Sequence, residues 1–225
     1  MAITIHIVPA VELSIRDPQE TNLGKRILQE AIFLLDEIGL EAFTFKKLAA
    51  RLESTEAGVY RYFANKHQLL VYLVSWYWDW VHHLVDQAVN RHTTPLDRLH
   101  AAVRALTRPA ITNPDVPYID ERVLHRVVVN EGSKAYHTKA VDQENRKGIF
   151  LGYKSLSADI AQLILCVRPD FSYPNTLATT LFEMAHNHPY FAEHLPRLTD
   201  IQHGEDQTEE LADMLLFWVD RLLAK

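Results

Sequence analysis

Residues 43–66 read FTFKKLAARLESTEAGVYRYFANK, and this stretch decides the fold of the N-terminal part of the chain. A threonine hydroxyl at a helix start accepts a hydrogen bond from the free N–H groups of the first turn. Thr44 is therefore expected to cap a short helix over about 45–52, and Thr55 to cap a second one that ends near residue 63. Two short helices joined by a tight turn predict a helix-turn-helix unit.

Longer helices are expected on both sides of this unit. Thr21 or Asn22 is expected to cap a helix that runs to about Ile38, because apolar residues recur there at three- and four-residue spacing, and Gly39 is expected to end it. Asn65 is expected to cap a long helix that continues to about Asn90. Farther along, the pattern predicts helices over about 94–109, 118–131, 140–168, 174–195 and 207–224.

These patterns predict an all-α fold with three parts. Residues 21–70 form the helix-turn-helix domain, and residues 71–225 form a helical body. Residues 1–20 are expected to be an extended arm. Within it, residues 3–7 alternate apolar and polar side chains as a strand does, but a single strand has no partner in so helical a chain.

Composition restricts the class of protein. Of the 225 residues, 48% are hydrophobic and 23% are charged, which is typical of folded globular domains and excludes dominant disorder. No stretch of 18 uncharged apolar residues and no signal-peptide pattern occurs, so neither a membrane partner nor secretion is expected. The single cysteine, Cys166, excludes an internal disulfide and favours a reducing, cytoplasmic location. It follows three apolar residues and is expected to be a buried thiol.

The distribution of charge matters more than its sum. The net charge of −6 taken alone argues against a nucleic-acid partner. Residues 21–70, however, hold seven Lys and Arg against six Asp and Glu, a balance of +1. The least acidic part of the chain therefore coincides with the predicted helix-turn-helix domain.

The same block resembles the DNA-binding domain of TetR/AcrR-family transcriptional regulators. The resemblance covers roughly residues 21–70, and its core is the pattern Val-Tyr-x-Tyr-Phe-x-Asn-Lys over 59–66, followed by two leucines at 69 and 70. It implies that the second short helix probes the major groove while flanking groups contact phosphates. It also implies that residues 71–225 form an effector-binding and dimerisation domain.

The resemblance and the chemistry of the block together give a set of candidate DNA contacts. Glu56 can accept a hydrogen bond from cytosine N4, Arg61 can bind guanine or phosphate, and Gly58 allows close backbone approach. The full set is Thr44, Lys46, Thr55, Glu56, Ala57, Gly58, Tyr60, Arg61, Tyr62 and Lys66.

Structural alternatives remain open for several of these residues. Tyr60 and Tyr62 are also compatible with core aromatics of a helical bundle. Lys46 is as compatible with an ordinary solvated face as with a phosphate contact. Glu53 occupies the turn position where the family usually has glycine, so it must tolerate or avoid a left-handed backbone conformation.

The long helix after Asn65 carries Trp76, Trp78 and Trp80, and three tryptophans in five residues cannot all face one core. Trp78 and His82 share a helix face at i,i+4 spacing and are predicted to border an effector pocket. Plain packing between domains is the alternative interpretation of this pair.

Twelve histidines raise the question of a metal site. Three His–carboxylate pairs have i,i+4 spacing, but none has a third ligand that the sequence identifies. No metal and no cofactor is therefore predicted. A phosphate-binding glycine loop and a nucleophile elbow are also absent from the sequence, so the chain is predicted not to be an enzyme.

The last two predicted helices, 174–195 and 207–224, have broad apolar faces, and by resemblance they form a homodimer interface. The combined prediction is a homodimeric regulator, a repressor released by a small-molecule effector, that binds an inverted-repeat operator in double-stranded DNA. The alternative is a ligand-sensing or protein-interaction module of the same fold that has lost specific DNA binding. Glu53, Glu56 and the net charge motivate that alternative.

Overall fold

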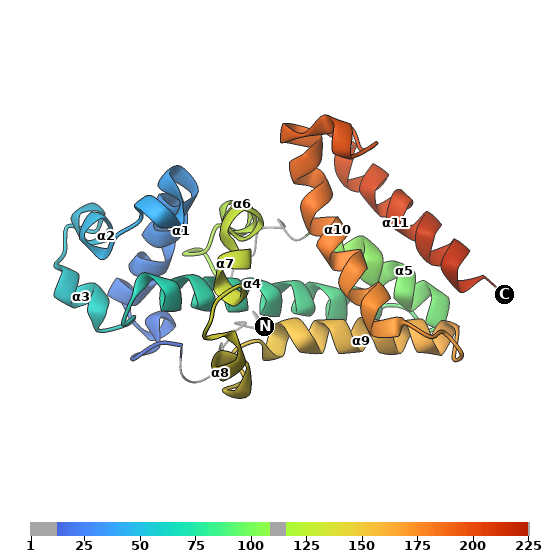
Figure 1. Cartoon of the computed structure of the whole chain (residues 1–225), viewed down its shortest axis with the longest axis horizontal. Coiled ribbons are helices and arrows are strands. Elements are labelled where there is room, and N and C mark those ends of the chain that lie inside the picture. The colour runs from blue at the N-terminus through green and yellow to red at the C-terminus, as the bar shows by residue number, and fades with distance from the viewer. Residues whose placement is uncertain (1–12, 109–115, 225) are drawn as a thin grey trace. The chain divides into compact units, whose positions relative to one another are not determined.

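The computed structural model describes residues 13–108 and 116–224, and no strand is assigned among them (Figure 1). This confirms the predicted all-α class. The elements are η1 Pro18–Glu20, α1 Asn22–Ala42, α2 Phe45–Arg51, α3 Glu56–Tyr60, α4 Lys66–Val89, α5 Pro95–Leu106, α6 Glu121–Glu131, α7 Ser133–Tyr136, α8 Val141–Arg146, α9 Leu151–Val167, α10 Pro174–His194, η2 Pro196–Leu198 and α11 Gln207–Leu223.

The predicted helix starts are confirmed by side-chain caps. Thr21 Oγ1 accepts from the Gly24 amide at 3.0 Å, and Thr44 Oγ1 accepts from the Lys47 amide at 3.2 Å. Thr55 caps α3 in the same way at 3.2 Å, and the Asn65 amide oxygen accepts from the Gln68 amide at 2.9 Å. Each cap satisfies a donor that the first helical turn leaves unpaired.

Tertiary contacts divide the chain into two compact units. Unit 1 comprises Met1–Asp79 and Ala110–Gly152, and unit 2 comprises Trp80–Pro109 and Tyr153–Lys225. Unit 1 thus combines α1, α2, α3 and the first part of α4 with α6, α7 and α8. The predicted domain boundary at residue 70 remains a prediction.

The tryptophans of α4 follow this division. Trp76 and Trp78 belong to unit 1 and are 0% and 5% exposed, whereas Trp80 belongs to unit 2 and is 4% exposed. The expectation that the three rings cannot share one core is met because the helix passes from one unit into the other.

Three local predictions need comment. The single helix over 140–168 is wrong: Gly148, at a φ of 81°, separates α8 from α9. The prediction of a buried thiol at Cys166 is also wrong, because this side chain is exposed. Gly39 interrupts the helical dihedrals of α1 with a φ of 69°, as predicted, although one more turn follows it. The strand-like residues 3–7 lie outside the described residues.

Across the described ranges, no helix combines the length and the apolar composition that a bilayer span requires.

Candidate nucleic-acid interface

The first three helices of unit 1 are held together by an aromatic and aliphatic core. Phe43, Leu48 and Phe63 are fully buried, and Val59 of α3 is 1% exposed. Burying side chains of this size stabilises the domain by about 1.5–3 kcal/mol each. The core fixes one side of α3, so the opposite side faces solvent.

The turn between α2 and α3 contains a strained residue. Glu53 adopts a φ of 51°, the left-handed region that an L-residue other than glycine enters at a cost of about 1–2 kcal/mol. Its amide donates to the Ala50 carbonyl at 3.2 Å, and the next amide, that of Ser54, donates to Ala49 at 2.9 Å. These two hydrogen bonds maintain the sharp turn despite the strain.

Replacing Glu53 with glycine is therefore expected to stabilise the protein by up to about 1 kcal/mol, since glycine enters this conformation freely but loses more backbone entropy on folding. Urea unfolding of the two proteins measures the difference. Glu53→Ala retains the strain and is the matched control. A glycine variant less stable than the alanine variant would contradict this interpretation of the turn.

The solvent-facing side of α3 presents a small polar surface. Glu56, Ala57 and Arg61 are exposed, and Tyr60 is 49% exposed. The Tyr60 ring packs edge-on against Phe45 with centroids 5.0 Å apart, which fixes its direction while leaving the hydroxyl accessible. Glu56, Tyr60 and Arg61 offer hydrogen-bond donors and acceptors on this face, and Ala57 adds an apolar methyl group. Reading base edges requires groups of both kinds.

Gly58 does not lie on the exposed face of α3 with its neighbours. It is buried, and a Cβ built on it would lie 3.1 Å from the hydroxyl oxygen of Ser54. A side chain at this position would crowd the Ser54 hydroxyl inside the domain. Close approach of the Gly58 backbone to DNA remains a prediction.

The Tyr62 side chain is also buried in the interior of the domain. Its side chain is 3% exposed, and its hydroxyl is hydrogen-bonded to Thr21 Oγ1 at 2.7 Å. The Tyr62 carbonyl accepts from the Ile15 amide at 2.8 Å, which attaches the segment before α1 to the domain. The core alternative therefore describes the Tyr62 ring in this structure.

Lys66 binds the end of α1. Its ammonium group donates to the carbonyls of Leu40, Glu41 and Phe43 at 2.8, 3.2 and 3.3 Å. These carbonyls lie just after Gly39, where the helical hydrogen-bonding pattern is interrupted. A cation there satisfies several acceptors at once, which gives Lys66 a structural role in this conformation.

Replacing Lys66 with methionine is expected to lower the free energy of unfolding by about 2 kcal/mol, because charge-assisted hydrogen bonds to three carbonyls are lost. Lys46→Met is the matched control: Lys46 is exposed on α2 of the same domain, and its loss should change stability by less than about 0.5 kcal/mol. Chemical unfolding of both variants measures this. Equal stabilities would overturn the structural role of Lys66.

The remaining cations near α2 differ in availability. Lys47 Nζ donates to the Ala42 carbonyl at 2.8 Å. Arg51 binds Glu37 through two nitrogens at 2.6 and 2.7 Å and Glu30 at 2.7 Å. The hydrogen bonds from Arg51 lower the pKa of the Glu37 carboxyl, and those carboxylates raise the pKa of Arg51 in turn. Arg51 therefore links α2 to α1. Lys46 and Arg61 are exposed cations on this face.

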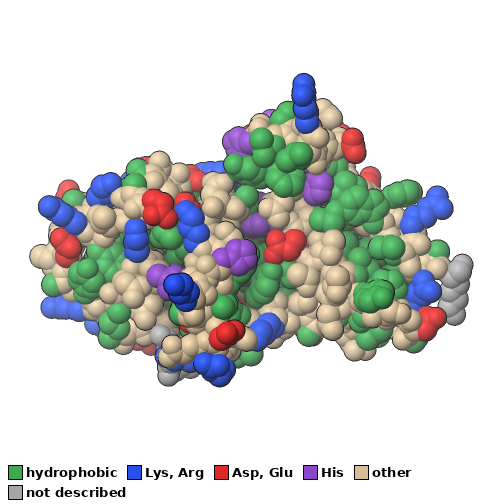
Figure 2. Space-filling view, viewed as in Figure 1, with side chains coloured by type: hydrophobic (Ala, Val, Ile, Leu, Met, Phe, Trp, Pro, Cys, Tyr) green, Lys and Arg blue, Asp and Glu red, His purple; other side chains and the backbone are tan. Residues whose placement is uncertain are grey.

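Figure 2 shows Lys and Arg side chains standing out over the part of the molecule that holds α2 and α3, with a few carboxylates among them. This region lies within residues 21–70, which the sequence shows to be the least acidic part of the chain. The sequence could not show which of the region's cations are bound to backbone carbonyls or carboxylates.

A second attachment joins α1 to α6. Arg126 contacts Asp36 through two nitrogens at 3.1 and 2.6 Å, and Glu131 Oε1 accepts from the Leu40 amide at 3.1 Å. Lys134 Nζ lies 2.6 Å from the other Glu131 oxygen. A Cβ at Gly39 would meet Glu131 at 3.0 Å. The sequence did not identify Glu131, because its partner lies 91 residues away.

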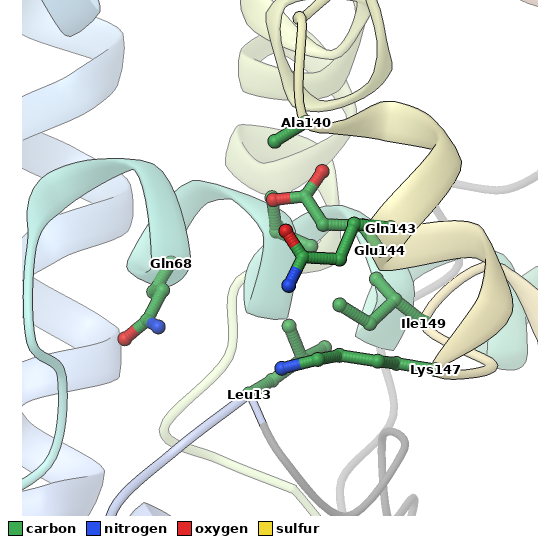
Figure 3. Close-up of a pocket in the computed structure, with 8 residues that line it drawn as sticks. Leu13, Gln68, Ala140, Gln143, Glu144, Lys147 and Ile149 are labelled. Carbon is green, nitrogen blue, oxygen red and sulfur yellow. The ribbon is translucent and has the colours of Figure 1, made fainter.

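The predicted effector-pocket residues are placed as follows. Trp78 is buried in unit 1, and His82 in unit 2 is hydrogen-bonded to Asp159. A cavity of about 150 Å³ in unit 1 is lined by neither of them (Figure 3). Its polar lining comes from Gln68 and from three residues of the α8 region, Gln143, Glu144 and Lys147. It is smaller than the roughly 300–1,000 Å³ of most small-molecule sites, so the effector pocket remains a prediction.

Two short helices around a tight turn, with the second helix exposing a polar face, define a DNA-binding helix-turn-helix protein. Residues 27–73 match the family model described as bacterial regulatory proteins, tetR family. The DNA-binding domain of this chain is therefore similar to that of the tetR family of bacterial regulatory proteins.

The chain is also similar to a curated protein over part of its length. The nucleoid occlusion factor SlmA of Idiomarina loihiensis (strain ATCC BAA-735 / DSM 15497 / L2-TR) is 29% identical over 98 residues, which are 44% of this chain and 50% of that protein. The chain thus matches about half the length of this curated relative.

Solved structures show the same fold over most of both chains. A tetR-family regulatory protein from Rhodococcus RHA1 has a TM-score of 0.66 at 17% identity, covering 90% of this chain and 97% of that one. AibR, in a complex with isovaleryl coenzyme A and operator DNA, has a TM-score of 0.58 at 18% identity, covering 86% and 97%. At these identities the likeness concerns the fold alone.

Proposed function

We propose that this protein is a homodimeric transcriptional repressor that binds an inverted-repeat operator in double-stranded DNA and is released by a small-molecule effector. The observation that carries the proposal is the exposed face of α3, where Glu56, Ala57, Tyr60 and Arg61 are accessible on a buried core. In this proposal, Arg61 binds guanine or a backbone phosphate, and Glu56 accepts from cytosine.

The phosphate contacts in this proposal come from the flanks of α3. Thr44, Lys46 and Thr55 are exposed on the same domain. The Lys46 ammonium group neutralises a backbone phosphate, and the counterion that was condensed on the DNA there is released. Lys66 and Tyr62 contribute indirectly, by fixing the end of α1 and the segment before it.

An effector is part of the proposal because the chain has a second helical unit beyond the DNA-binding helices. AibR, which has the same fold, forms a complex with both isovaleryl coenzyme A and operator DNA. A shared fold makes a small molecule of unknown identity a reasonable second partner here. The contacts of Arg126 and Glu131 with α1 offer a way for movement of α6 to reach the DNA-binding helices.

The dimer in this proposal forms through α11. One side of this helix is buried in unit 2, whereas Phe217 and Leu222 are 57% and 48% exposed, and Met214 and Trp218 are partly exposed. These four residues follow helical spacing and form one apolar stripe. Apolar stripes of this kind pair in helix bundles, and two copies are needed to place probe helices one DNA turn apart, about 34 Å.

Phe217→Glu is expected to weaken self-association at least tenfold, because a carboxylate in an apolar interface loses its hydration. Sedimentation velocity over a range of protein concentrations measures the effect. Tyr173→Glu is the control, since Tyr173 is 70% exposed but lies outside the stripe. A native protein that is monomeric throughout, or a Phe217→Glu variant that dimerises normally, would contradict this interface.

The function is tested by selecting bound fragments from a randomised DNA pool with purified protein. Before selection the protein is unfolded, washed free of small molecules and refolded, so that a retained effector does not block binding. Enrichment of an inverted repeat with half-sites about ten base pairs apart, or a multiple of that spacing, is expected. Failure to enrich any sequence at low salt would refute the proposal and favour a module without specific DNA binding.

A further inference from the structure

Unit 2 brings a histidine and two carboxylates together on its surface. His82 and Asp86 lie one turn apart on α4, and Asp159 lies on α9. His82 Nε2 is 2.7 Å from Asp159 Oδ2 and 3.9 Å from Asp86 Oδ1. One ligand atom from each of the three residues lies within 4.8 Å of the other two.

The electrostatics of this cluster favour a divalent cation. Two carboxylates this close repel each other by roughly 1 kcal/mol in water and by more where the protein excludes water. A protonated imidazole supplies one positive charge and lies much closer to Asp159 than to Asp86. A divalent ion placed between all three groups neutralises both carboxylates and accepts the imidazole lone pair as well.

We propose that His82, Asp86 and Asp159 form a binding site for a divalent transition-metal ion of the zinc type. Imidazole nitrogen and carboxylate oxygen are ligands that zinc accepts at about 2.0–2.2 Å, with a fourth position left for water. The donor atoms already lie within the separation that a common ion bridges after small side-chain rotations. The site is accessible, because the His82 side chain is 20% exposed and those of Asp86 and Asp159 are 59% and 58% exposed.

The third ligand is what distinguishes this cluster from the His–carboxylate pairs visible in the sequence. His82 and Asp86 are one of the three His–carboxylate pairs in the sequence, and no metal was predicted because the sequence identifies no third ligand. Asp159 follows 73 residues after Asp86. Helix α9 supplies this third ligand, and the hydrogen bond from His82 to Asp159 holds it beside α4. A bound ion would tie these two helices together within unit 2, whether or not the protein binds DNA.

Isothermal titration of zinc chloride into chelator-treated full-length protein tests the proposal. One ion per chain is expected to bind, and His82→Ala and Asp159→Asn are each expected to weaken binding at least tenfold. Because the ion binds the folded state, a hundredfold excess over Kd should also raise Tm by about 5 °C in the native protein. At the same zinc concentration, the rise in Tm of each variant should be at most about half that of the native protein.

His100→Ala is the matched control. His100 Nε2 also lies 2.7 Å from one carboxylate, that of Asp220, at similar exposure, but the described residues provide no three-ligand set around it. This variant should bind zinc as the native protein does. Absence of binding to the native protein would overturn the proposal. So would unchanged affinity in His82→Ala and Asp159→Asn, which would assign the ion to other histidines.

Discussion

Replacing Arg61 with alanine is expected to lower the affinity for the selected operator by at least about thirtyfold. Each well-placed arginine contact to a base contributes about 1–3 kcal/mol, and a dimer on an inverted repeat loses the contact in both half-sites. Stability should hardly change, because Arg61 is exposed at the end of α3. Fluorescence anisotropy with labelled operator fragments measures the affinity.

Arg122→Ala is the control for this experiment. Arg122 is an exposed arginine in the same unit, but it lies on α6 and not on the α3 face. Its removal should leave operator affinity within about twofold, the small effect expected where a cation makes no DNA contact. If both variants lose affinity equally, the net charge and not the α3 face determines binding. If neither does, the probe helix is assigned incorrectly.

The second large effect concerns the dependence of stability on pH. Burial lowers the pKa of His125 to about 4, with a further contribution from the neighbouring Arg126 charge, and Tyr77 is hydrogen-bonded to its Nδ1 at 2.9 Å. The unfolded chain binds a proton on this residue near pH 6.5, whereas the folded chain resists protonation until about pH 4. Between these values the unfolded state holds more protons, so the free energy of unfolding falls as the pH is lowered.

The shift corresponds to about 3 kcal/mol of stability, which is present above pH 6.5 and is lost progressively down to pH 4. Urea unfolding at intervals of half a pH unit should show a steeper fall for the native protein than for His125→Gln, which retains a polar group beside Tyr77 but does not titrate. NMR titration of the His125 ring gives an independent measurement. A ring that titrates near pH 6.5 in the folded protein would contradict this account.

Local features of the fold were predictable from the sequence because their causes are local. Thr44 and Thr55 cap helices through amides three residues away, and the chemistry of that contact depends only on spacing. The sequence left open whether Glu53 tolerates or avoids a left-handed backbone in the turn, and the structure shows that it adopts one. The all-α class followed from the spacing of apolar residues.

Side-chain direction was not predictable to the same degree. Helix α3 ends at Tyr60, before the predicted end near residue 63. So short a helix has too few turns to tell its buried face from its exposed one, so Gly58 and the following Tyr62 were grouped with exposed neighbours. The break at Gly148 was missed because the surrounding residues continue a helical pattern. Contacts such as that of Glu131 with Leu40 join residues far apart in the sequence, and a single sequence carries no signal for them.

The central claim is that α3 recognises a specific DNA sequence. The most direct test is an anisotropy titration of the native protein with the selected fragment and with a fragment of equal composition but shuffled half-sites, at about 50 and 200 mM salt. The account predicts binding to the selected fragment roughly 10³-fold tighter than to the shuffled one, and a steep loss of affinity with salt for both. Equal affinity for the two fragments at both salt concentrations would contradict it.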